Sequence, residues 1–551
     1  MLDLRSEATG PGNHLRAGPL AAALLAALVT YLLMNYLLVD DVITQLPARV
    51  PYKSAAYIGW LGCGFVTLLA LFATAPRMLL YVLVPVLFVS LVVNYAYASI
   101  ANVPLSLDVI AWLPHEAAQL SNAWAEYRND IASAILKALA ALAALVAVRF
   151  ALLRDPWLGR RLTRRGVRMA AVAAFLGFHA ATLALQPPLA AAETNLVVFG
   201  MPSLFSTIPE PRPVSTQPAR APLVRHVVLV VDESVTHEAY KKLIAPRVRT
   251  LPAIEYGEAA STANCSAASN ALLRWGVERA RIREPGYDPR TNPMIWGYAK
   301  AAGFRTVLID GQSTGNMHNY VNPREFALID EFVAADRGPD TDHHIARMLN
   351  ERLRRPGREF IYVVKRGAHF PYEMNYPAGT VPADASRAAK YAAAITHASA
   401  GFFAGLDRTA PLSDVLMIYT SDHGQDFRER AAHCNPRPRA AEYSVPLVVL
   451  TAAPPLRALL SDAAPMQNRA SHLNIFPTLL YAFGYARPWL EGIYGPTLAG
   501  PPAPYVTYVS LGWRAGARGA DRHTVRASDF VESASFPRRG AREARGKAND
   551  G

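Results

Sequence analysis

The stretch VLMIYTSDHGQ, residues 415–425, decides the fold of this 551-residue chain. An apolar run with β-branched and aromatic members that ends at a polar corner predicts a buried strand followed by a loop. At that corner Asp422 and His423 stand side by side, and the glycine after them lets a ligand approach the backbone closely. A carboxylate oxygen beside an imidazole nitrogen suits Zn²⁺ or Mn²⁺. An isolated Asp-His pair is more often a structural hydrogen bond, so the residues around it decide its meaning.

Further apolar runs follow the same pattern in the C-terminal half of the chain. HVVLVVDES, TVLIDGQ, FIYVVKRGAH and VPLVVLTA are candidate strands, and helical stretches separate them. This alternation predicts parallel βαβ units in an α/β sheet that is covered on both faces. Ligands of such sheets bind beyond the carboxyl ends of the strands. We expect that edge to carry Glu233, Asp310, His369, Asp422 and His423.

Ser266 lies in NCSAASN, residues 264–270, just before the apolar helical stretch ALLRWG. A serine there would have backbone N–H groups and the positive end of a helix dipole directed at an incoming phosphate. A hydroxyl becomes a nucleophile when a metal lowers its pKa. The alternative is that Ser266 or Ser269 only caps the helix, and the residues alone leave both interpretations open.

Three more side chains could join the Asp-His pair. Glu233 follows the run VVLVVD and would add an oxygen ligand, although alone it would be read as a helix-capping acid, and Asp232 is its neighbouring competitor. His369 in KRGAHFPYEMNYP and His433 in RAAHCNPRP would each, alone, be a surface or hydrogen-bonded histidine. Beside a carboxylate-imidazole cluster they become candidates for a second metal or for gripping phosphoryl oxygens.

The apolar residues, 52% of the chain, are concentrated before residue 190. A bilayer requires roughly 20 apolar residues per helix. We predict five transmembrane helices at residues 17–39, 54–76, 78–100, 131–153 and 169–192. Lys137 and Arg149 lie near the ends of the fourth segment, where long side chains reach the headgroups.

Charge orients these helices and divides the chain. The connection between the fourth and fifth segments is rich in arginine, so the positive-inside rule places the N-terminus in the cytoplasm and everything after residue 192 outside. An amphipathic segment within residues 101–130 would lie on the outer membrane surface or pack as a loop helix. The predicted domains are a transmembrane domain at 1–192, a proline-rich linker at 193–222, a catalytic α/β domain at 223–514 and a disordered basic tail at 515–551.

The formal net charge of +13 does not indicate a nucleic-acid partner. The arginines gather in a membrane-flanking loop and in the tail, without the interleaved aromatics of a nucleic-acid-binding face. Three cysteines exclude a disulfide framework. Cys63 lies in an apolar segment, whereas Cys265 and Cys434 flank candidate site residues and could be one disulfide or two thiols outside the cytoplasm.

Taken in order, five motifs resemble those of the membrane-anchored phosphoethanolamine transferases of the alkaline phosphatase/sulfatase superfamily, the lipid A-modifying and colistin-resistance type. They are VVLVVDES, NCSAASN, GAHFPYEMNYP, YTSDHGQ and SHLNIFPTLL. The likeness covers almost the whole chain, from the membrane segments through the linker to the α/β domain. It departs from the family at Ser266, where threonine is common, and at Gln425, where the family has an acid.

The resemblance implies a role for each matching residue. Zinc, one or two ions with Mn²⁺ as an alternative, would be held by Glu233, Ser266, Asp422 and His423, with Ser266 as the nucleophile. His369 and His433 would bind the phosphate or a second zinc.

The same resemblance implies the reaction and its place. Phosphoethanolamine would pass from phosphatidylethanolamine to a membrane glycolipid, lipid A or the lipopolysaccharide core, through a covalent phospho-serine. The protein would be a multi-pass protein of the bacterial inner membrane with its catalytic domain in the periplasm. Alternatives are a phosphoglycerol transferase that uses phosphatidylglycerol and a non-catalytic membrane-anchored relative. A sulfatase is disfavoured because Cys265 begins CSAAS and lacks the Cys-x-Pro-x-Arg maturation motif.

Overall fold

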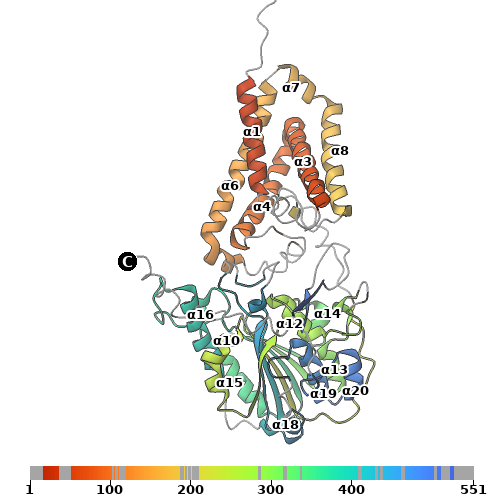
Figure 1. Ribbon diagram of the computed structural model, residues 1–551, viewed down its shortest axis with the longest axis vertical. Helices are drawn as coiled ribbons and strands as arrows, with labels where there is room; N and C mark the ends of the chain where they lie inside the picture. The colour runs from red at the N-terminus through yellow and green to blue at the C-terminus, as the bar shows by residue number, and fades with distance from the viewer. Residues whose placement is uncertain are drawn as a thin grey trace, which may run out of the picture. The chain divides into compact units, whose positions relative to one another are not determined.

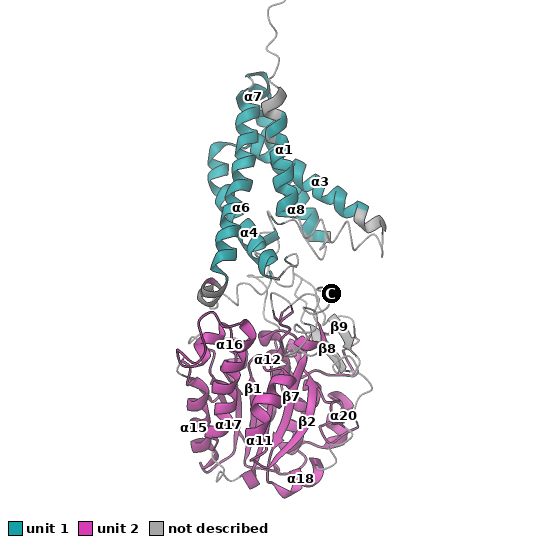
Figure 2. Ribbon diagram, turned by 60° about the vertical axis from the view of Figure 1, so that its left-hand side comes forward, with its two compact units in different colours: residues 1–112, 127–206 teal, residues 113–126, 207–551 magenta. Residues whose placement is uncertain are grey.

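A computed structural model, drawn in Figure 1, gives the fold of this protein. It describes residues 17–35, 51–101, 105, 110, 120–154, 156–185, 192, 195–196, 200, 210–282, 284, 287–313, 319–335, 338–406, 412–428, 432–434, 439–460, 466–501, 506–510 and 521–525. The chain forms two compact units, one of residues 1–112 and 127–206 and the other of residues 113–126 and 207–551 (Figure 2).

The first unit is helical. Its helices are α1 (Ala17–Met34), α3 (Pro51–Thr74), α4 (Arg77–Ala101), α6 (Leu120–Arg154), α7 (Pro156–Leu162) and α8 (Arg165–Leu185). Helices are expected from such apolar segments because a backbone in lipid must satisfy its polar groups internally. One apolar cluster joins α1, α3, α4, α6 and α8 through residues such as Tyr31, Leu68, Leu91, Ala138 and Phe175.

The predicted membrane anchor is supported in part. Within the described residues, three helical segments are long and apolar enough to cross a membrane: Ala55–Thr74, Arg77–Ile100 and Tyr127–Arg154. Leu24–Met34 is a shorter apolar segment at the first predicted span, and α8 lies at the fifth. The protein is therefore membrane-anchored by a helical region, while five crossings stay a prediction. Most of the predicted amphipathic segment and much of the linker lie outside the described residues.

The second unit is built on a mixed β-sheet. In the described part of the chain, seven strands form it in the order β2-β7-β6-β1-β5-β3-β4. The strands are β1 (His226–Asp232), β2 (Ala253–Ala260), β3 (Arg305–Asp310), β4 (Glu331–Ala334), β5 (Glu359–Val364), β6 (Val415–Ser421) and β7 (Ser444–Leu450). The predicted α/β sheet is confirmed.

The prediction of purely parallel strands is wrong at one edge. VPLVVLTA forms β7, which pairs antiparallel with β6, and β2, which the sequence pattern did not indicate, pairs antiparallel with β7. A parallel return needs a crossover, usually a helix. Between β6 and β7 the described residues hold only the short turn η9 (Ala440–Glu442), so the chain turns back beside β6 in the opposite direction.

Helices cover both faces of the sheet, as Figure 1 shows. Val227 and Leu229 of β1 enter one apolar cluster, and the alternate residues Val228 and Val230 enter the other. The first face packs on α12 (Ser266–Trp275), α13 (Ile295–Ala301), α19 (Ile475–Ala482) and α20 (Arg487–Ile493). The second packs on α10 (His237–Ala239), α11 (Ala245–Val248), α15 (Thr341–Leu353), α16 (Arg387–Ala394) and α17 (Ala400–Gly405). Burial on both faces explains why these strands are continuously apolar.

Smaller elements complete the unit. The short helices are α14 (Pro323–Phe326), α18 (Pro454–Leu460) and the 3₁₀ turns η5 (Pro289–Thr291), η6 (Tyr372–Asn375), η8 (Leu412–Asp414) and η11 (His472–Asn474). Single π turns, η4 (Tyr240–Ile244) and η7 (Ile395–Ser399), join α10 to α11 and α16 to α17. Strand β8 (Val506–Ser510) pairs antiparallel with β9 (Asp521–Val525). The structure thus forms a strand within the segment that the sequence predicts to be disordered; residues 526–551 lie outside the described part.

Register places the site at the carboxyl edge. In the parallel pair β1–β6, Asp232 lies opposite Ser421, and in β1–β5, Val231 lies opposite Val364. The next residues, Glu233 and Asp422, therefore leave neighbouring strands side by side.

Candidate metal centre

The structure brings Glu233, Asp422 and His423 together at the ends of β1 and β6. All three are buried, and their potential ligand atoms lie within 4.8 Å of one another. The Nε2 atom of His423 is 3.6 Å from Oε1 of Glu233 and 3.7 Å from Oδ2 of Asp422. Two carboxylates and one imidazole at these separations could share one cation.

Ser266 reaches this cluster from the start of α12. Its Oγ is 3.1 Å from Nε2 of His423 and 3.4 Å from Oε1 of Glu233. Cys265 occupies the N-cap position, so Ser266 is the first helical residue and is not the cap. The other candidate, Ser269, is also inside the helix, where its hydroxyl lies 3.3 Å from Nδ1 of His472. The capping alternative is therefore not what the structure shows, and the Ser266 hydroxyl is directed at the carboxylates and imidazole.

Neighbouring groups fix the two carboxylates. Glu233 accepts hydrogen bonds from Oγ of Ser234 (2.6 Å) and Nε2 of Gln312 (2.9 Å), one at each oxygen. Ser234 adopts the left-handed φ of 62°, which a serine rarely takes, and its N–H donates to Oδ1 of Asp422 at 2.9 Å. The other oxygen of Asp422, Oδ2, is buried and accepts no hydrogen bond within the described residues. An unsatisfied buried carboxylate oxygen is the kind of group that a cation satisfies.

Burial and the charges of neighbouring groups shift the pKa values of these side chains. Burial raises the pKa of Asp422 well above its ordinary value, and the Glu233 carboxylate raises it further. For Glu233, burial raises the pKa, but the charges of His423 and His369 and hydrogen bonds outweigh it and lower the value to about 2. Burial lowers the pKa of His423. Nδ1 of His423 donates to the carbonyl of Gly424 at 2.8 Å, so the neutral ring presents the lone pair of Nε2 to Ser266.

The two other predicted histidines lie around the cluster and are not among the three residues that could hold a metal ion. The ring of His433 stacks on His423 with centroids 4.3 Å apart, and its Nδ1 donates to Oε1 of Gln425 at 3.1 Å. His369 bonds the carbonyl of Phe370 through Nδ1 (2.6 Å) and is near enough for its charge to lower the pKa of Glu233.

A disulfide joins Cys265 to Cys434, which settles the alternative left open by the sequence. The N–H of Cys434 also donates to the carbonyl of Asn264 at 2.8 Å. The bond therefore connects the residue before Ser266 to the residue after His433.

Asp310 lies at the carboxyl end of β3, as expected, and its Oδ1 accepts from the N–H groups of Gln312 and Ser313, so it closes its own loop. One sequence expectation needs correction. The glycine after the Asp-His pair does not make room for a ligand. A Cβ on Gly424 would instead meet backbone, including the carbonyl oxygen of Ser444 at 2.7 Å.

Buried charged residues beneath the site were not among the residues predicted from the sequence. Lys365 is fully buried and pairs with Asp232 at 2.5 Å and Asp342 at 3.2 Å, so Asp232 is engaged away from the cluster. Gln312 donates to both Glu233 and the carbonyl of Lys365. The sequence does carry a sign of this ion pair. Lys365 directly follows the apolar run FIYVV, and a charge buried there requires a partner of opposite charge.

Comparison with known proteins places this domain. Residues 225–485 match the sulfatase family model, so the chain contains a sulfatase-family domain. The integral membrane protein lipooligosaccharide phosphoethanolamine transferase A (EptA) from Neisseria meningitidis has a similar structure, with a TM-score of 0.54 and 15% identity over 88% of this chain and 99% of that one. No curated protein sequence matches the chain.

The C-terminal periplasmic domain of EptC from Escherichia coli is also similar, with a TM-score of 0.45 and 16% identity over 58% of this chain and 96% of that one. The complex of the same domain with Zn has a TM-score of 0.44 and 15% identity over 58% of this chain and 97% of that one. The family match, with the fold shared with EptA, confirms the predicted relation to the alkaline phosphatase/sulfatase superfamily.

Proposed function

We propose that this protein transfers phosphoethanolamine from phosphatidylethanolamine to a membrane glycolipid, lipid A or the lipopolysaccharide core. One observation carries the proposal: the Ser266 hydroxyl meets Glu233, Asp422 and His423 at the carboxyl edge of the sheet. A nucleophile beside a cluster that can hold a cation is the requirement for metal-assisted phosphoryl transfer. The sulfatase-family domain and the fold shared with a phosphoethanolamine transferase support the same reading.

The residues present fit Zn²⁺. Two carboxylates, an imidazole and a hydroxyl are oxygen and nitrogen ligands that zinc accepts, and Mn²⁺ is the alternative. The unsatisfied Oδ2 of Asp422 is an independent sign, since a bound cation would give it a partner. Zinc held there would acidify the Ser266 hydroxyl and polarise a phosphoryl oxygen. His369 and His433 are proposed to bind the phosphate or a second zinc.

The proposed reaction has two steps. Oγ of Ser266 attacks the phosphorus of phosphatidylethanolamine, the bond from phosphorus to the glycerol oxygen breaks, and diacylglycerol leaves with the serine proton. A hydroxyl or phosphate oxygen of the acceptor then attacks the phosphorus of the phosphoethanolaminyl-serine, the bond from phosphorus to Oγ breaks, and Oγ of Ser266 regains a proton from the attacking hydroxyl or from solvent. Ser266 is the first residue of α12, so the N–H groups and the positive dipole end of that helix would favour the phosphoryl anion in both steps.

The proposed location is the bacterial inner membrane, with several crossings and the catalytic domain in the periplasm. The Cys265–Cys434 disulfide supports an oxidising compartment for that domain. Donor and acceptor both reside in membranes, so an anchored domain meets them at a raised effective concentration.

Mass spectrometry of glycolipids from cells that carry or lack the gene tests the proposal. We expect an added phosphoethanolamine with the wild-type chain, none with Ser266→Ala, and retained transfer with Ser266→Thr, which keeps a hydroxyl. Transfer by the alanine variant at the wild-type level would remove Ser266 from the mechanism. An added phosphoglycerol would identify a phosphatidylglycerol-dependent enzyme, and an unchanged glycolipid pool together with a metal-free protein would identify a non-catalytic relative.

A further inference from the structure

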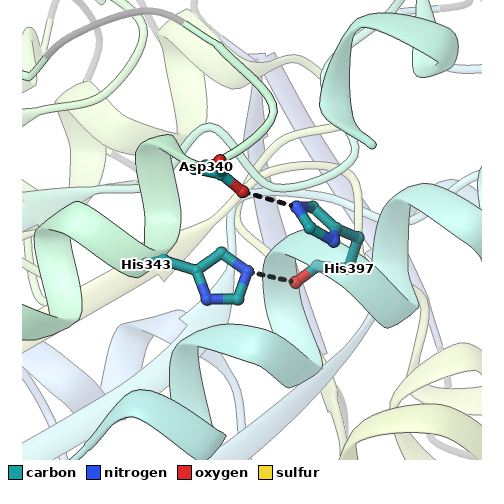
Figure 3. A group of neighbouring side chains, drawn as sticks. All are labelled: Asp340, His343 and His397. Atoms are coloured by element: carbon teal, nitrogen blue, oxygen red, sulfur yellow. Dashed lines mark hydrogen bonds and ion pairs between the residues drawn. The ribbon is translucent and has the colours of Figure 1, made fainter. Parts of the chain in front are cut away.

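We propose that Asp340, His343 and His397 form a second metal site, which binds a divalent cation of the Zn²⁺ class and is separate from the Glu233 centre. Their potential ligand atoms lie within 4.8 Å of one another. Figure 3 shows the Asp340 carboxylate and the two imidazoles converging from two separate helical segments. Asp340 is the N-cap residue of α15, His343 lies in the first turn of that helix, and His397 lies in the π turn η7.

Hydrogen bonds already join the three residues of this cluster. Nε2 of His397 lies 2.9 Å from Oδ1 of Asp340, and Nε2 of His343 donates to the carbonyl of His397 at 3.1 Å. The two imidazole centroids are 4.8 Å apart. Ligands of one zinc ion lie at about 2.0–2.2 Å from it, so small rotations of these side chains would accommodate the ion between them.

The backbone is shaped to present His397. It belongs to η7, a single π turn inside the continuous helical run of α16 and α17. Such insertions are rare and recur at functional sites. The insertion changes which face of the helix His397 occupies, and it brings both the ring and the carbonyl of His397 to α15.

Gly401 makes room for the second imidazole. A Cβ at this position of α17 would lie 2.5 Å from Cε1 and 2.6 Å from Nε2 of His343. A glycine inside a helix costs about 1 kcal/mol relative to alanine. The chain therefore keeps an unfavourable helical residue where the alternative would displace the His343 ring.

The site is open to incoming ions. The Asp340 side chain is 60% exposed and that of His397 is 24% exposed. Three protein ligands leave one position for water in a tetrahedral arrangement. Two imidazoles select Zn²⁺, Cu²⁺ or Ni²⁺ over Mg²⁺ and Ca²⁺, which prefer oxygen ligands.

Binding here would join α15 to the helical run that contains η7. Asp342, one residue before His343, points the other way and accepts hydrogen bonds from the N–H groups of Arg366 and Gly367. A cation would therefore stabilise the helix start that holds the loop after β5. We expect its effect on thermal stability rather than on the chemistry at Ser266.

Zinc titration of the full-length protein in detergent tests the site by stoichiometry. Asp340→Asn and His343→Gln should each bind one Zn²⁺ fewer than the wild type. His344→Gln is the matched control, because His344 is the adjacent histidine of the same helix and is outside the cluster. Gly401→Ala should weaken the same binding event without removing any ligand.

Thermal unfolding gives a second readout. Zn²⁺ should raise the unfolding midpoint of an Asp422→Asn variant, whose proposed catalytic centre is impaired, and should not raise it once Asp340→Asn is added. Mg²⁺ should leave the midpoint unchanged. Equal zinc stoichiometry in the wild type, Asp340→Asn and His343→Gln would overturn the proposal. If His343→Gln fails to fold, the exposed Asp340 decides the result alone.

Discussion

Glu233 is held in place by donors at both carboxylate oxygens, among them Ser234 at Oε1 and Gln312 at Oε2. Partners of this kind orient a metal ligand, and their loss lowers metal affinity by about 10–100-fold. We expect Gln312→Ala to weaken zinc binding at this centre by that factor, as measured by competition with a chelator. Gln467→Ala, at an exposed glutamine, is the control. Equal affinities for both variants would show that Gln312 does not position Glu233.

His472 provides a pH prediction. It is buried between Oγ1 of Thr420 (3.0 Å) and Oγ of Ser269 (3.3 Å), and burial lowers its pKa to about 3 from the ordinary 6.5. Between these values the unfolded chain binds a proton that the folded chain does not, so this residue lowers stability as the pH falls from 6.5.

The full-length His472→Gln variant should therefore lose less of its thermal midpoint than the wild type between pH 6.5 and pH 4. One proton corresponds to about 1.4 kcal/mol per pH unit. The same decline in both proteins would show that His472 titrates normally in the folded chain.

Single residues also show what a sequence can predict about a site. Glu233, Asp422 and His423 each follow an apolar strand, and parallel strands end at one edge, so their meeting could be anticipated. Asp310 has the same local pattern, yet its carboxylate closes its own loop. Gln312 is separated from Glu233 by 79 positions, and an amide in a loop carries no local sign that it will contact a carboxylate.

At the scale of elements, the Cys265–Cys434 disulfide ties the start of α12 to the loop that carries His433. The two cysteines are 169 positions apart, and a cross-link over a long stretch restricts the unfolded chain. We expect Cys434→Ser to lower the free energy of unfolding by about 2–5 kcal/mol. Transfer should also fall, because the His433 loop loses its link to the Ser266 segment.

Cys63→Ser is the control, since Cys63 is a free cysteine in α3. The thermal midpoint and glycolipid transfer of both variants, compared under non-reducing conditions, measure the effect. A Cys434→Ser protein as stable and active as Cys63→Ser would leave the disulfide without a role at the site.

The antiparallel direction of the strands at one edge of the sheet could not be predicted from the sequence pattern. VPLVVLTA has the apolar run of any buried strand, and such a run does not encode direction. Direction follows from the connection, and the described residues between β6 and β7 hold site residues and η9 and include no crossover helix. The β2 run AIEYGEAA includes two glutamates and a glycine, and its burial is partial, so it lacks the signal of the central strands.

For the whole molecule, the proposal depends on a catalytic domain that shares a chain with a helical membrane anchor. Hydropathy predicts that anchor, because a helix that crosses a bilayer requires a long run of apolar residues, and such a run is visible in the sequence. The number of crossings is harder to predict, since only three segments meet the length and hydropathy requirement among the described residues, and the first and fifth predicted segments are not among them. In the proposed reaction, the chemistry at Ser266 would not require the anchor, whereas access to a lipid donor and a lipid acceptor would require it.

A protease-cleavable linker tests whether the anchor is needed for the chemistry or for access to the lipids. A protease site introduced between residues 207 and 210, followed by cleavage, should leave hydrolysis of a soluble phosphodiester unchanged, because Ser266, Glu233, Asp422 and His423 stay in one unit. Transfer between lipids in mixed vesicles should fall by about 10²-fold or more, as expected when tethering no longer supplies the effective concentration. The uncleaved protein with the same insertion is the control. Equal loss of both activities would mean that cleavage damages the domain, whereas full lipid transfer by the released domain would show that the anchor serves another purpose.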